Sequence, residues 1–158
     1  MILYHGSNTS FDAIDLSKSL PNKDFGKGFY LSDNYEQAEE MAKFKVIISG
    51  GSVVIQSYHT DDSLLEDLTL NIKIFKEYTK EWAEFILANR NNSSDTPVHN
   101  YDIVYGPIAN DKVGIQIRKY KDGSINFEEF LHRLQYMKGI TFQYFFGTEK
   151  AINKLRRL

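Results

Sequence analysis

Two short glycine-containing segments near the start of the chain constrain its fold most strongly. The first is Leu3–Ser7 (LYHGS) and the second is Asp24–Ser32 (DFGKGFYLS). Each is a short apolar run beside glycine, the pattern by which a strand brings its backbone close to a ligand. The sequence therefore predicts two strands that together contribute to a binding pocket.

Three residues in these segments have side chains or backbone groups suited to a planar ligand. His5 lies at a strand end, where its imidazole can donate a hydrogen bond to a sugar hydroxyl, and Gly6 leaves its amide and carbonyl uncovered for a flat carboxamide. The run around Tyr30 alternates between two faces, so one aromatic face can meet a planar ring. The alternatives are an ordinary strand-end histidine and a half-buried strand tyrosine.

A third aromatic strand, Thr141–Phe146 (TFQYFF), completes a recognisable pattern with the first two. The set resembles the ADP-ribosyltransferase superfamily, in the branch of diphtheria toxin and the poly(ADP-ribose) polymerases, which has a His, a Tyr and usually a Glu on three separate strands. His5 and Tyr30 match the first two positions, and Gln143 stands where glutamate is usual. The chain also resembles a bacterial domain-of-unknown-function family of this superfamily nearly end to end, including Tyr101–Pro107.

This resemblance implies that NAD is the substrate and assigns roles to individual residues. His5 would bind the nicotinamide ribose, Tyr30 would stack on nicotinamide, and Gln143 would orient the ribose while nicotinamide leaves. Tyr35, or alternatively Phe44, would cover the other side of the ring. The expected catalytic residues are His5, Tyr30 and Gln143, and the expected NAD-binding residues are His5, Gly6, Ser7, Gly28, Tyr30 and Tyr35.

Gln143 decides how much catalysis the pattern supports. An amide can orient a ligand, but it cannot carry negative charge or act as a base. The acids that could substitute are Glu149, Asp111 and Asp102. Glu149 follows Thr148 at a predicted helix start, where a carboxylate also stabilises the helix dipole without any catalytic role.

Length and composition restrict the remaining possibilities. A chain of 158 residues with 42% hydrophobic content predicts one domain over residues 1–158. It contains no cysteine, which excludes disulfides and thiolate metal sites, and its four histidines have no metal-ligand spacing. Its first residues resemble neither a signal peptide nor a membrane anchor. We therefore expect a cytoplasmic protein without a metal site, and the net charge of −2 gives no general attraction to nucleic acid.

Hydrophobic periodicity and capping residues predict the local structure. The expected strands are 2–6, 46–48, 53–58, 101–105 and 140–146, with a glycine turn at 50–51 between the second and third. The expected helices are 35–44, 75–90, 111–121, 126–137 and a terminal helix that begins after Thr148. Residues 111–121 also alternate as in a strand, which is the alternative to the helix there. The resemblance adds an α+β fold with two packed, mainly antiparallel sheets around an NAD cleft and flanking helices.

The function implied by the resemblance is mono-ADP-ribosyl transfer to a macromolecular acceptor, either protein or nucleic acid. It also implies a bacterial toxin or effector that a small antitoxin protein holds in check. Three alternatives remain open: an NAD glycohydrolase, a non-catalytic module that binds NAD or ADP-ribose, and an interaction domain that keeps only the fold.

Overall fold

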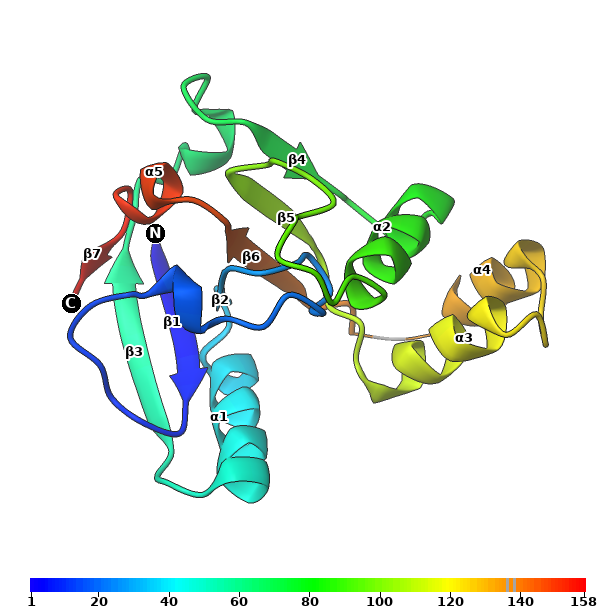
Figure 1. The fold of residues 1–158 in the computed structure, drawn as a ribbon, viewed down its shortest axis with the longest axis horizontal. Helices are drawn as coiled ribbons and strands as arrows, with labels where there is room; N and C mark the ends of the chain where they lie inside the picture. The colour runs from blue at the N-terminus through cyan, green and yellow to red at the C-terminus, as the bar shows by residue number, and fades with distance from the viewer. Residues whose placement is uncertain (136, 138) are drawn as a thin grey trace.

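A computed structural model describes residues 1–135, 137 and 139–158, and it shows an α+β fold (Figure 1). The helices in these ranges are α1 (Tyr35–Ser49), α2 (Lys80–Arg90), α3 (Asp111–Lys121), α4 (Phe127–Gln135) and α5 (Glu149–Ile152). The strands are β1 (Ile2–Ser7), β2 (Phe29–Leu31), β3 (Val54–His59), β4 (Ile72–Ile74), β5 (Ile103–Pro107), β6 (Phe142–Phe146) and β7 (Arg156–Arg157). Two short 3-10 turns lie at Leu16–Lys18 and Leu64–Glu66.

The strands form two sheets, and the sheets meet where the middle of β1 lies beside Ser32, the residue after β2. One sheet has the order β1-β3-β7 and is antiparallel, and the other has the order β2-β6-β5-β4, in which only β4 and β5 are parallel. The backbones of Tyr4 and Ser32 exchange two hydrogen bonds of 2.7 and 2.9 Å between the sheets. This confirms the expected α+β class with two mainly antiparallel sheets.

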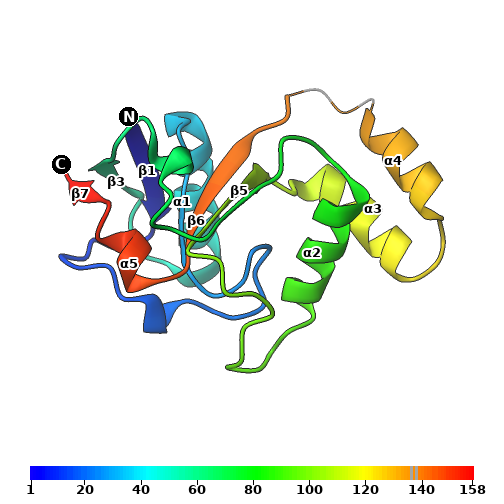
Figure 2. The same ribbon diagram turned by 90° about the horizontal axis from the view of Figure 1, so that it is seen from above.

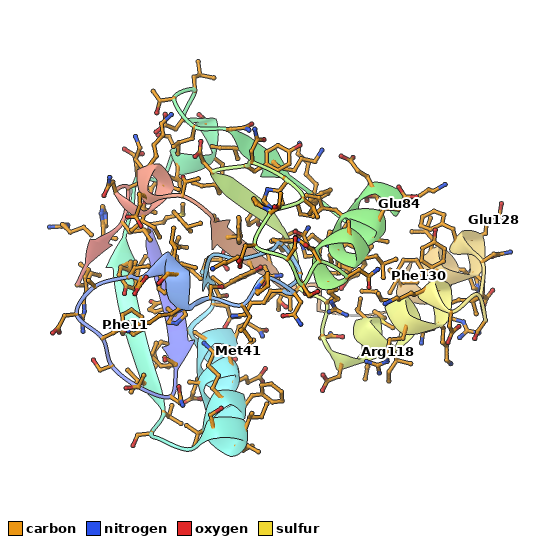
Figure 3. All side chains as sticks on the ribbon, in the orientation of Figure 1. Phe11, Met41, Glu84, Arg118, Glu128 and Phe130 are labelled. Atoms are coloured by element: carbon orange, nitrogen blue, oxygen red, sulfur yellow. The ribbon has the colours of Figure 1, made fainter. Side chains whose placement is uncertain are left out.

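Figures 1 and 2 show the helices in two groups. The first helix, α1, packs against β1 and β3, whereas α2, α3 and α4 extend away from the chain termini on the other side of the larger sheet. Strand β6 separates two hydrophobic clusters, because alternate residues of a strand point to opposite faces. Phe145 joins the cluster of Trp82 and Phe130 under the helices (Figure 3), while Tyr144 and Phe146 join the other.

The expected strand 46–48 is wrong, because α1 continues through these residues to Ser49. Asn34 caps the helix start with a side-chain oxygen that accepts from the Gln37 amide, and Gly50 ends it with φ +74° and an N–H that donates to the Val46 carbonyl. Strand propensity of β-branched residues depends on cross-strand and core packing. Ile47 and Ile48 are exposed and lack that packing, so the helical hydrogen bonds continue to the glycine.

The expected helix 75–90 begins five residues late. Its first part instead follows β4, and the Phe75 amide donates to the Tyr105 carbonyl at 2.8 Å, which prolongs the parallel pairing with β5. Thr79 is the true N-cap, since its side chain accepts from the Trp82 amide. Pairing with a neighbouring strand therefore overrides the helical periodicity of residues 75–79.

The other expected elements are present, most of them with shifted ends, whereas the strands β4 and β7 were not expected. The helix expected over 111–121 is confirmed as α3, and the helix expected over 126–137 is shorter, because α4 ends at Gln135. Residue 136 of that expectation lies outside the described residues. The terminal helix expected after Thr148 is short, because α5 ends at Ile152, and Arg156 and Arg157 pair with β3 as β7.

Candidate functional site

His5, Tyr30 and Gln143 come together at one open cavity of about 360 Å³. They come from β1, β2 and β6, so the cavity lies where the two sheets meet. Gly6 and Gly28 also line it, as do residues of the loop before β2 and of α1. The fold thus places five of the predicted site residues on a single cavity.

The imidazole of His5 has a fixed tautomer. Its Nδ1 lies 2.7 Å from the Tyr30 carbonyl oxygen, and because a carbonyl only accepts, Nδ1 must carry the proton. Burial, with the charge of Lys45 as the next cause, lowers the pKa of His5 to about 3. His5 is therefore neutral at pH 7, and its Nε2 accepts a hydrogen bond. This reverses the expectation that the imidazole donates to a sugar hydroxyl.

Tyr30 offers its ring rather than its hydroxyl. The hydroxyl donates to the Gly26 carbonyl at 2.7 Å and accepts from the Phe25 amide at 3.0 Å. Burial raises the pKa of Tyr30 well above its ordinary value, so this hydroxyl stays protonated near neutral pH. The loop before β2 turns at Gly26, whose φ of +95° is a backbone conformation that favours glycine. The aromatic ring lies along the cavity wall, where the Lys23 ammonium is 5.5 Å from its centroid.

Gln143 has a buried donor without a partner. Three buried side-chain N or O atoms in the described part of the chain have no hydrogen-bond partner, and Gln143 Nε2 is the one of the three that belongs to this cavity. Buried polar groups in native proteins nearly always have a hydrogen-bond partner, and exceptions often lie at binding sites. The unpaired amide and its place on the cavity wall make Gln143 a candidate contact for a polar ligand.

Gly6 serves packing more than the sequence suggested. A Cβ on this residue would lie 1.9 Å from the Ala38 carbonyl oxygen, so glycine is required for α1 to approach β1. Its own carbonyl is not uncovered, as expected, but accepts from the Lys45 ammonium at 2.7 Å. Gly28 likewise packs closely, since a Cβ there would lie 2.2 Å from the Phe145 ring.

Helix α1 contributes further residues to the cavity that were not among the predicted site residues. Gln37, Met41 and Lys45 line it (Figure 3 labels Met41). Their spacing of four residues places them on one helical face, and this signal was present in the sequence. It was overlooked because the helix was expected to end at residue 44, before Lys45.

Two predicted ligand contacts lie away from the cavity. Ser7 is buried, and its hydroxyl accepts from the Thr9 amide at 3.3 Å. Tyr35 packs edge-on against the Tyr4 ring at 5.4 Å and is half exposed, and the alternative, Phe44, is also exposed. None of the three lines the cavity. Met41, six residues after Tyr35 on α1, is instead the large apolar side chain of this helix that lines the cavity.

The candidate acids also lie elsewhere. Asp102 is bound in the fold, where its carboxylate accepts from Thr148 Oγ1 at 2.6 Å and from the Asn71 amide at 2.7 Å. Asp111 and Glu149 are exposed in the first turns of α3 and α5. The carboxylate that does line the cavity is Asp24, and its Oδ1 is paired with Arg90 Nε at 2.6 Å.

The cavity consequently has a positive character. Among the lining residues that the structure describes, Lys23 and Lys45 are the cationic ones and no unpaired carboxylate is present. The searched positions also contain no group of His, Asp and Glu able to hold a metal ion, and no helix long and apolar enough to cross a membrane. An anionic or neutral ligand fits this set of groups better than a cation.

Comparison with known proteins identifies one family. The model of a family described as "Protein of unknown function (DUF3990)" matches residues 1–157. No curated protein matches the chain.

Proposed function

The chain belongs to this family of unknown function, and from its own residues we propose that it is an NAD-dependent ADP-ribosyltransferase. The observation that carries the proposal is the meeting of His5, Tyr30 and Gln143, from three strands of two sheets, at one cavity. The same order of residues and strands led to the resemblance to the His-Tyr-Glu branch of ADP-ribosyltransferases. The partnerless Gln143 amide supports a ligand at this position.

The proposed reaction breaks the bond between the ribose anomeric carbon and the nicotinamide nitrogen, and the bonding electron pair leaves with nicotinamide. Tyr30 presents its ring face to nicotinamide, because its hydroxyl is already held by the backbone. His5 Nε2 accepts a hydrogen bond from a ribose hydroxyl. The Gln143 amide holds the ribose while positive charge develops on the ribose ring. The acceptor then bonds to the anomeric carbon and loses its proton to solvent.

The absence of an unpaired carboxylate among the described lining residues affects the rate in this proposal. A carboxylate beside the ribose would stabilise the developing cation, and such preorganised electrostatic groups are each worth about 10²–10³ in rate. Gln143 supplies a dipole in its place. We therefore expect slow nicotinamide release, and an acceptor that is itself a good nucleophile.

The test has two parts: nicotinamide release from NAD labelled in the nicotinamide ring, and transfer of label to components of a bacterial lysate from NAD labelled in the adenine ring. Gln143→Ala should reduce release at least tenfold, because it removes the amide that orients the ribose. Gln116→Ala is the matched control, since Gln116 lies on α3 and does not line the cavity. Wild-type protein that neither releases nicotinamide nor binds NAD would refute the proposal.

A second candidate is a non-catalytic module that binds NAD or ADP-ribose. The lack of a free acid on the cavity favours it, since such a site can bind and orient a ligand without promoting bond breakage. Saturable NAD binding without nicotinamide release would establish this alternative. Release in buffer without a lysate-labelled product would instead indicate an NAD glycohydrolase.

The toxin role and the antitoxin partner are part of the proposal as the resemblance implies them. Expression of wild type and Gln143→Ala in a bacterial host, with growth followed by optical density, tests the toxin role. Growth arrest by the wild type alone is the expected result. A labelled protein or nucleic acid in the lysate experiment would identify the class of acceptor.

A further inference from the structure

Two lysines in the wall of the cavity have no carboxylate partner. Lys23 lies in the loop before β2 and Lys45 lies on α1, and both are half-buried. None of the ion pairs between described residues includes either ammonium group. Partly burying a cation without a counter-charge costs free energy, so two such cations on one cavity indicate a site for an anion.

The two ammonium groups occupy the places that the proposed function gives to nicotinamide. Lys45 Nζ donates to the Gly6 carbonyl at 2.7 Å, where the carboxamide would bind. Lys23 Nζ lies over the Tyr30 ring, 5.5 Å from its centroid, where the pyridinium ring would stack. A nicotinamide group that enters the cavity must therefore displace both lysines.

The charges around the two lysines favour an anion between them. Burial lowers the pKa of Lys23, and burial together with the charge of Lys23 lowers the pKa of Lys45 to about 8. The other charged group on the cavity, Asp24, is neutralised by Arg90 and does not repel an anion strongly. A diphosphate carries two negative charges near neutral pH, and charge-assisted hydrogen bonds to it would compensate both ammonium groups.

We propose that Lys23 and Lys45 form an anion subsite for the diphosphate of the dinucleotide. When nicotinamide binds at Tyr30 and Gly6, it displaces the two ammonium groups from these places, and they then bind the diphosphate. The inference rests on the proposed function for the identity of the nicotinamide end. The anion subsite itself depends only on the two lysines and can be tested separately.

The test compares four variants that each remove one positive charge and keep the aliphatic stem. Lys23→Met and Lys45→Met change the subsite. Lys27→Met and Lys43→Met are the controls: Lys27 lies in the same loop but lines a different cavity of about 410 Å³, and Lys43 lies on the same helix but is paired with Glu39 at 2.9 Å. Isothermal titration calorimetry at pH 7 measures ADP-ribose, inorganic pyrophosphate and nicotinamide binding to each protein.

The proposal predicts opposite effects on the two ends of the ligand. Each subsite variant should bind ADP-ribose and pyrophosphate about tenfold more weakly, whereas both controls bind them like the wild type. Nicotinamide alone should bind the subsite variants at least as well as the wild type, because its competitor has been removed. Lys→Arg at the same positions should restore anion binding, which separates loss of charge from loss of fold.

Several results would overturn the inference. Equal weakening in all four variants would mean a general charge effect, and no weakening in any would mean that the lysines do not contact the anion. Equal affinity of the wild type for pyrophosphate and ADP-ribose would indicate a site for a free phosphate anion instead of a dinucleotide. If the anion subsite behaves as expected but NAD neither binds nor reacts, the proposed function fails and the subsite remains. If the subsite variants release nicotinamide and bind NAD as tightly as the wild type, the proposed function remains and the anion subsite fails.

Discussion

The substitution Gly6→Ala tests how the fold builds the cavity. A methyl group on Gly6 would lie 1.9 Å from the Ala38 carbonyl oxygen and 2.9 Å from the Ala42 nitrogen, both in the backbone of α1. Cβ atoms essentially never come within 3.0 Å of such atoms, and backbone cannot rotate away as a side chain can. The helix must therefore move off β1 by about 1 Å, and a gap of this size loses roughly a quarter to a half of the dispersion attraction.

The expected loss of stability follows from this displacement. Ala38 and Ala42 are buried against β1, and overpacking at such contacts typically costs about 1–3 kcal/mol. Because the obstruction is backbone on both sides, we expect a value near the upper end, about 3 kcal/mol. In a domain of this size that corresponds to a fall in Tm of roughly 6–12 °C.

Gly114→Ala provides the matched control. Gly114 lies inside α3, and a Cβ there has nothing within 4 Å. The same substitution should therefore stabilise the protein by about 0.5–1 kcal/mol, because alanine is the better helix former. Thermal denaturation followed by circular dichroism compares the two variants with the wild type. A Gly6→Ala protein that melts within about 2 °C of the wild type would refute the packing argument.

The remaining predictions concern pH and the Gln143 position. The free energy of unfolding should fall by about 1.4 kcal/mol for each unit that the pH falls below 6.5, because folded His5 stays neutral down to about pH 3 while the unfolded chain takes up the proton. Urea denaturation at pH 5.5 and 7.5 measures this fall, which should be smaller in His5→Asn than in the wild type. ADP-ribose affinity should decline as the pH rises through 8, where Lys45 loses its proton, and calorimetry of Lys45→Arg should show no such decline, because arginine stays charged. His5, Lys23 and the Asp24–Arg90 pair share the cavity and are unchanged in that comparison. Gln143→Glu should accelerate nicotinamide release at least tenfold, since it places a carboxylate beside the ribose, and an unchanged rate would argue against this position for Gln143.

The sequence determined the elements whose signals are local. Thr148 caps α5 as its side chain predicts, and glycine-flanked apolar runs form β1 and β2. The resemblance placed His5, Tyr30 and Gln143 at one site, and the structure brings all three to one cavity, while their roles stay predictions. Caps and strand patterns depend on neighbours a few residues away, so a single sequence contains them.

Tertiary structure alone decided which groups are free to act. The Gly6 carbonyl and the Tyr30 ring look available in the sequence, yet Lys45 and Lys23 occupy them. The Tyr30 carbonyl accepts a hydrogen bond from His5 Nδ1, so the other ring nitrogen, Nε2, is an acceptor and not the expected donor. Asp102 is bound by Thr148 and Asn71. These outcomes depend on atoms that lie far apart in the chain and within hydrogen-bonding distance in space. Local sequence patterns therefore locate the strands of the site, while long-range contacts determine its charge and chemistry.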